Sequence, residues 1–122
     1  MNTEILYHGA NGDSILAILT TKFMLPGAGK IFFAMHKWES ALMHGADTRR
    51  RASFVIKVRV DIPPDAVKTR TATPGVADTL IVETRRGLRA EVLELYVRKP
   101  VGGGFEIQHL IGPQAITSYL SI

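Results

Sequence analysis

The clearest pattern in the chain is the alternation of apolar and polar positions between residues 53 and 60. The apolar side chains lie two residues apart, with Lys57 and Arg59 between them: Phe54, Ile56, Val58 and Val60. Because successive side chains of a strand point to opposite faces of a sheet, this spacing predicts a strand with one buried face. Pro63-Pro64 marks its end.

Two other segments carry apolar residues at helical spacing. Those at positions 15, 16, 18 and 19 follow a turn and N-cap signal at positions 11–14, and they predict a helix that runs to about residue 21. A second helix is expected from residue 36 to about residue 46, with Trp38, Ala41 and Leu42 on one side.

Shorter apolar runs, bounded by glycine, proline or charged turns, predict further strands. They lie at residues 4–8, 30–34, 79–82, 91–97 and 105–111, with a last short strand at Tyr119-Leu120. Residues 65–78 have no strong period and are expected to form a loop. The order is strand, helix, strand, helix and then mostly strands, which predicts one α+β domain over residues 1–122 with a largely antiparallel sheet.

Composition narrows the possible chemistry. The 122 residues are 46% hydrophobic and 21% charged, which is ordinary for a packed globular domain. There is no cysteine, so a disulfide, a thiolate metal site and a cysteine nucleophile are excluded. The four histidines have no metal-ligand spacing, so no metal is expected, and no apolar run is long enough to predict a membrane span. The net charge of +4 and the pI near 9.7 favour polyanionic partners, although a charge of this size also simply maintains solubility.

Three ordered segments carry the candidate chemistry. The first is an apolar strand that ends in Tyr7-His8-Gly9 and is followed by a loop and a helix. The second is a short strand that follows glycines, Ile31-Phe32-Phe33-Ala34, with Trp38-Glu39-Ser40-Ala41-Leu42 after it. The third is a glutamate that opens a late strand, Phe105-Glu106-Ile107, with Pro113-Gln114-Ala115-Ile116 downstream.

In this order the three segments resemble the ADP-ribosyltransferase superfamily, on the branch of diphtheria toxin and the poly(ADP-ribose) polymerases. The resemblance implies a small split-sheet α+β fold with two short helices in the N-terminal half, and NAD⁺ as the substrate. It implies that His8 bonds the adenosine ribose, that the Gly9 backbone bonds the nicotinamide amide, and that Phe32, in the place of the family's tyrosine, stacks on nicotinamide. Tyr7 and Ser40 are implied as further contacts.

Glu106 is the carboxylate that the resemblance assigns to catalysis. It would bond the nicotinamide ribose and stabilise the positive charge that develops there, as a carboxylate does in glycoside cleavage. Glu91 is a rival, since Ala90-Glu91-Val92-Leu93 is also an acidic residue that leads an apolar strand.

The expected function is mono-ADP-ribosyl transfer to a macromolecule, either protein or structured RNA. Bare domains of this kind resemble the toxin modules of bacterial polymorphic systems. They imply a secreted effector that acts in a target-cell cytoplasm, with its delivery signal outside this chain, and a cognate immunity protein. Two alternatives stay open. One is NAD⁺ hydrolysis or removal of an RNA 2′-phosphate, and the other is a basic nucleic-acid-binding module without catalysis.

Overall fold

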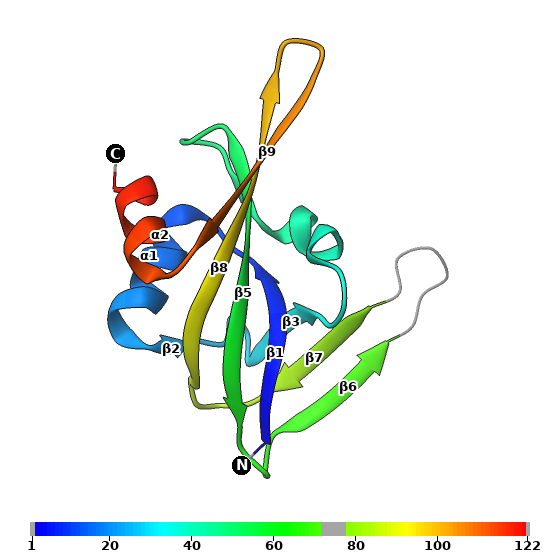
Figure 1. The fold of residues 1–122 in the computed structure, drawn as a ribbon. Coiled ribbons are helices and arrows are strands. Elements are labelled where there is room, and N and C mark those ends of the chain that lie inside the picture. The colour runs from blue at the N-terminus through cyan, green and yellow to red at the C-terminus, as the bar shows by residue number, and fades with distance from the viewer. Residues whose placement is uncertain (1, 72–77, 122) are drawn as a thin grey trace.

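The protein is described by a computed structural model that covers residues 2–71 and 78–121. The elements follow the order β1 (Asn2–Gly9), α1 (Gly12–Thr21), β2 (Phe23–Met24), β3 (Lys30–Ala34), the 3₁₀ helix η1 (Trp38–His44), β4 (Ala46–Asp47), β5 (Ala52–Ile62), β6 (Val67–Thr71), β7 (Thr79–Glu83), β8 (Leu88–Val101), β9 (Gly104–Ile111) and α2 (Pro113–Leu120). Figure 1 shows a twisted sheet with α1 and α2 together on one side and η1 on the other.

The sheet is antiparallel at every described pairing. Its strand order is β2-β8-β5-β1-β3-β7-β6, while β4 pairs with β5, and β9 pairs with β8. The long strands β5 and β8 form its centre, and a register shift between Lys57 and Val58 marks a bulge. The hairpin of β8 and β9 extends beyond the rest of the sheet (Figure 1).

The α+β prediction is wrong, because the described residues form a predominantly β structure, with one nine-stranded sheet and three short helices. Part of the difference lies in how short the helices are, since the segment expected to be helical over 36–46 forms only a seven-residue 3₁₀ helix. The other part lies in strands that the sequence patterns did not predict, because these strands are short or polar. Val67–Thr71 falls within the predicted loop yet pairs with β7 along its whole length, while residues 72–77 of that loop lie outside the described residues.

Some of the other predicted elements agree with the structure, and one does not. The helix at residues 12–21 and the strand at residues 30–34 agree with the prediction. The predicted last strand at Tyr119-Leu120 is instead the end of α2, which begins at Pro113. Proline suits the first turn of a helix because its missing N–H has no intrahelical partner there.

Two cores hold the layers together. The larger one lies between the sheet and the pair α1 and α2, and its fully buried side chains include Ile15, Phe54, Leu95, Ile116 and Leu120. A smaller core forms where η1 covers the opposite face of the sheet, around Ala34, Ala41 and Val55. Within the described residues, no helix is long and apolar enough to cross a bilayer.

Candidate functional site

The carboxyl end of β1 opens into a cleft of about 420 Å³. Its walls are the end of β1, one side of α1, the segment that follows α1, and the last residue of η1. The lining residues are His8, Gly9, Ala10, Asn11, Ser14, Ala17, Ile18, Thr21, Phe23, Met24, Leu25 and His44. A mostly apolar cleft of this volume with a few convergent polar groups has the size and character of a small-molecule site. We call it the His8 cleft.

His8 is held in one orientation by the neighbouring strand. Its Nδ1 lies 2.8 Å from the carbonyl oxygen of Phe32, and because a carbonyl can only accept, Nδ1 must carry the proton. Burial lowers the pKa of His8, against the effect of the Phe32 carbonyl, and the nearby His44 lowers it further. The imidazole is therefore neutral at pH 7, and its Nε2 is a hydrogen-bond acceptor suited to a hydroxyl group of a ligand.

Phe32 and His44 form a pair of nearly parallel rings, of which only His44 lines the His8 cleft. The ring that contacts His8 is that of Phe33, with centroids 5.6 Å apart, so the Phe32 side chain points to the other face of the sheet. The Phe32 and His44 rings have centroids 5.8 Å apart, with 18° between the ring planes. A planar ring held between them at van der Waals contact needs about 7 Å, so a movement of roughly 1 Å would admit one. Phe32 is partly exposed, although most large apolar side chains of this sheet are buried.

Gly9 lies at the end of β1, where η1 packs closest to the sheet. A Cβ atom at this position would lie 2.1 Å from the carbonyl oxygen of Ala41 and 2.8 Å from the backbone nitrogen of Gly45. The residue lines the His8 cleft. Its lack of a side chain is nevertheless explained by the contact with η1, whether or not a ligand is present.

Tyr7 and Ser40 lie outside the His8 cleft. Since side chains alternate along a strand, Tyr7 points to the opposite face from His8, and its ring meets that of Tyr96 edge-on at 6.1 Å. Ser40 lies on the outer side of η1, in a shallow hollow that also contains Lys37 and Arg98. The structure therefore does not bring either residue to the cleft.

Glu106 is also distant from His8. Following the strand pairing from β1 through β5 and β8 to β9, the residue level with His8 is Leu110, three strand spacings away. Glu106 lies four residues further along β9, towards the hairpin tip. With spacings of about 4.8 Å between strands and 3.3 Å per residue, the two Cα atoms are separated by roughly 19 Å. Glu91, the rival carboxylate, forms an ion pair with Arg59 and does not line the cleft either.

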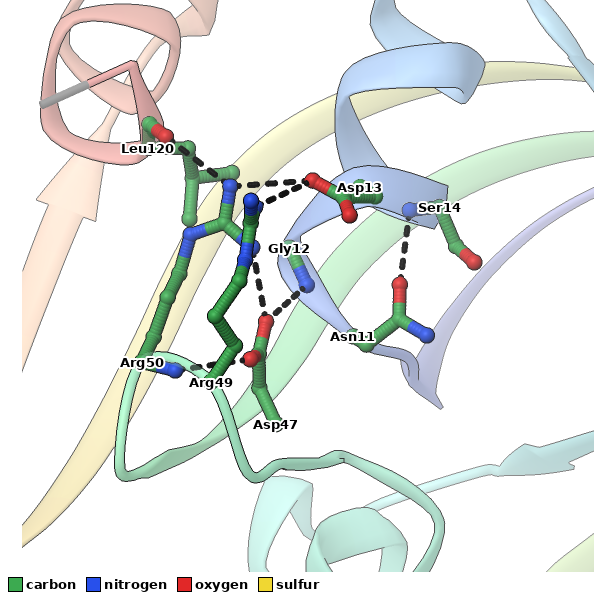
Figure 2. Close-up of polar contacts among 8 residues, drawn as sticks. All are labelled: Asn11, Gly12, Asp13, Ser14, Asp47, Arg49, Arg50 and Leu120. Atoms are coloured by element: carbon green, nitrogen blue, oxygen red, sulfur yellow. Dashed lines mark hydrogen bonds and ion pairs between the residues drawn. The ribbon is translucent and has the colours of Figure 1, made fainter.

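A charged cluster fixes the N-terminus of α1, which borders the cleft (Figure 2). The buried carboxylate of Asp47 accepts from the backbone N–H of Gly12 at 2.8 Å, from the Arg50 guanidinium at 2.9 Å and from the Arg50 N–H at 3.0 Å. Burial by itself raises the pKa of Asp47, but these donors outweigh it and hold the pKa below its ordinary value. Arg50 also bonds Asp13 and the carbonyl of Leu120, so the cluster joins α1 to α2.

A second polar cluster lies on the opposite face of the sheet and anchors β9. Glu94 bonds the ring nitrogen of His109 and lies 3.2 Å from the ammonium of Lys57. The Tyr96 ring stacks between those of Trp38 and His109, whose centroids lie 4.8 Å and 4.4 Å from its own. Burial and the Glu94 carboxylate raise the pKa of Tyr96 to about 12, so its hydroxyl stays protonated.

Sequence reasoning missed part of the cleft. Sequence patterns did not single out His44, and they indicated only a turn and a helix cap at positions 11–14. That cap is present, since the Asn11 side chain accepts from the Ser14 N–H at 2.8 Å. None of the described cleft-lining residues is a carboxylate. Within residues 2–71 and 78–121, no three histidine, aspartate or glutamate side chains are grouped as metal ligands.

Comparison with known proteins gives no match to this chain among family models, curated proteins or solved structures. The resemblance to ADP-ribosyltransferases therefore depends on the motifs of the chain itself and on where the structure places them.

Proposed function

We propose that the His8 cleft binds NAD⁺ and that the protein transfers ADP-ribose from it to a macromolecule. The observation that carries the proposal is that His8 and His44 line one cleft at the end of β1, where the Phe32 carbonyl bonds His8 and the Phe32 ring stacks on His44. Two motifs separated by more than 20 residues of sequence thus lie side by side. Their side chains offer the two things NAD⁺ requires, an acceptor for ribose hydroxyls and a stacking site for a planar cationic ring.

Each of these groups would have a distinct task. The nicotinamide ring would lie between Phe32 and His44, where stacking adds about 0.5–1.5 kcal/mol beyond burial. Nε2 of neutral His8 would accept from a ribose hydroxyl. The acceptor oxygen would attack C1 of the nicotinamide ribose, the glycosidic bond would break, and nicotinamide would leave neutral while the acceptor releases its proton.

The positive charge that develops on the ribose needs a nearby negative charge. Glu106 cannot contact a ribose held by His8 in this arrangement, because the two residues are three strands apart. The absence of a carboxylate among the described cleft residues favours a second candidate function, the removal of an RNA 2′-phosphate through an ADP-ribosylated intermediate. In that reaction the attacking phosphate itself brings negative charge to the ribose.

A macromolecular acceptor, protein or RNA, agrees with the basic character of the chain. A cavity of about 440 Å³ near α2 is lined by Arg49, Arg50 and Lys99, which adds a cationic surface on the same side as α1. We extend the proposal to a secreted effector that acts in a target-cell cytoplasm and to a cognate immunity protein that covers the cleft. An acidic surface on that partner would complement the net charge of +4.

The experiment is to incubate the purified protein with NAD⁺ labelled in its adenosine part and with cell lysate, and to measure both nicotinamide release and label on macromolecules. A nuclease step before electrophoresis separates RNA from protein acceptors, and a 2′-phosphorylated oligoribonucleotide tests the second candidate. We expect activity that His8→Ala and Phe32→Ala each reduce at least about 100-fold, equivalent to 2.7 kcal/mol of transition-state stabilisation. Unchanged activity in both variants would refute the site, and no nicotinamide release with any acceptor would refute the function.

A further inference from the structure

The strand β9 lies at an open edge of the sheet. Among residues 2–71 and 78–121, β8 is the only strand that pairs with it. The N–H and C=O groups along its outer side therefore have no strand partner there, and such a row is a template for another strand. Figure 1 shows the tip of the β8 and β9 hairpin projecting away from the helices, while the other end of β9 leads into α2.

The other long edge of the sheet is protected, and β9 is not. The edge strand β6 has the sequence Val-Lys-Thr-Arg-Thr, and the charges of Lys68 and Arg70 discourage pairing with a further strand. In β9 the only carboxylate is Glu106, and there is no lysine, arginine, proline or bulge. Three large apolar side chains of β9 are instead exposed to solvent. The exposed fraction is 62% for Phe105, 56% for Ile107 and 72% for Ile111. Apolar exposure along a bare strand edge is typical of a pairing surface.

We propose that β9 pairs antiparallel with β9 of a second copy of this chain, about a two-fold axis that passes through Gln108. In this register Phe105 of one copy faces Ile111 of the other, and Ile107 faces His109. Glu106 faces Leu110, so no two like charges are opposite each other. Every exposed apolar side chain of the strand gains an apolar or aromatic neighbour, which is the self-complementarity that a two-fold interface requires.

The charges around the strand permit this pairing. Two cations of β8 are opposite β9: Lys99, which faces Glu106, and Arg98, whose guanidinium lies 4.3 Å from the centre of the Phe105 ring on its own chain. In the proposed register the two copies of Arg98 are three strand spacings and two residues apart, or about 16 Å. That exceeds the Debye length of about 8 Å at physiological ionic strength, so their repulsion is screened.

A residue at the axis offers a second reason for this register. The side-chain oxygen of Gln108 is buried and has no hydrogen-bond partner among the described residues. After a rotation of the side chain, the carboxamides of the two Gln108 residues at the axis can each donate to the other. An interface of one strand pair is smaller than the 1,200–2,000 Å² of a typical stable complex, so we expect a dimer that dissociates on dilution.

The first test is sedimentation equilibrium of the full chain over a range of concentrations. We expect the average mass to rise from 13.4 kDa towards twice that value. Ile107→Lys should stay monomeric at every concentration, and Val67→Lys, at a position also 56% exposed but on β6, should dimerise as the wild type does. A monomeric wild type, or a dimer that persists in Ile107→Lys, would overturn the proposal.

The second test is a crosslink that does not depend on destabilising the dimer. The chain has no cysteine, so Gln108→Cys introduces a single thiol at the axis, where paired strands place Cα atoms within disulfide range. Under mild oxidation we expect this variant to form a covalent dimer. Phe105→Cys should not, since its two copies would be about 20 Å apart along the strands. Equal crosslinking of both variants would contradict the register, and crosslinking of neither would contradict the pairing.

Discussion

Loss of the small Asp47 side chain should lower the free energy of unfolding by more than its size suggests. Its side chain is 5% exposed and is the common acceptor for the Gly12 N–H, the Arg50 N–H and the Arg50 guanidinium (Figure 2). Asp47→Ala would leave the largely buried Arg50 charge and a helix N–H without their acceptor. Breaking a buried ion pair by removing one partner costs about 3–5 kcal/mol, and we expect the free energy of unfolding to fall by that amount.

Urea denaturation followed by fluorescence measures this loss, because Trp38 is the only tryptophan and stacks against Tyr96 in the folded protein. Asp13→Ala is the matched control. Asp13 also pairs with Arg50, at 3.0 Å, but its side chain is 69% exposed, and an exposed pair is worth about 0–1 kcal/mol. If Asp13→Ala destabilised the protein as much as Asp47→Ala, the cluster would not depend on burial and the reasoning would be refuted.

Three further predictions follow from the same geometry. Gly9→Ala should lower the free energy of unfolding by about 3 kcal/mol, because its Cβ would lie 2.1 Å from the Ala41 carbonyl oxygen; an unchanged melting temperature would contradict the close packing of η1. The pKa of Asp47 is lowered in the folded state, so its contribution to stability is complete above the ordinary aspartate pKa of about 3.9 and is lost as the pH falls through the lowered value. Unfolding measured from pH 7 down to about pH 2 should therefore show a steeper acid loss in the wild type than in Asp47→Asn. Glu106→Gln should leave the NAD⁺ dissociation constant unchanged within about twofold, since the residue lies roughly 19 Å from His8; a loss of binding measured by calorimetry would show that β9 closes over the cleft.

The sequence predicted those elements whose own residues determine them. The alternation at residues 53–60 fixes both the strand and its buried face, and Phe54, Ile56, Val58 and Val60 are all buried in the larger core. The helix at residues 12–21 has a cap and an apolar side that its local sequence encodes. Val67–Thr71 could not be predicted in this way, because a polar edge strand depends on the neighbour that supplies its hydrogen bonds.

Only the part of the candidate site that consists of residues adjacent in the sequence could be predicted. Placing His8 and Gly9 at the end of a strand was enough to bring them into the cleft. The ring pair of Phe32 and His44 depends on how η1 folds back over the sheet, and the separation of Glu106 depends on β9 pairing with the outer side of β8. Both depend on how distant segments pack together, which spacing along one chain does not reveal.

Imidazole resonances in an NMR titration with NAD⁺ test the central claim most directly. The chain has four histidines, of which His8 and His44 line the cleft, while His36 and His109 lie outside it and serve as internal controls. We expect the signals of His8 and His44 to shift together with NAD⁺ concentration and those of His36 and His109 to stay unchanged. Absence of any shift at saturating NAD⁺, or shifts confined to His36 or His109, would contradict binding at the His8 cleft.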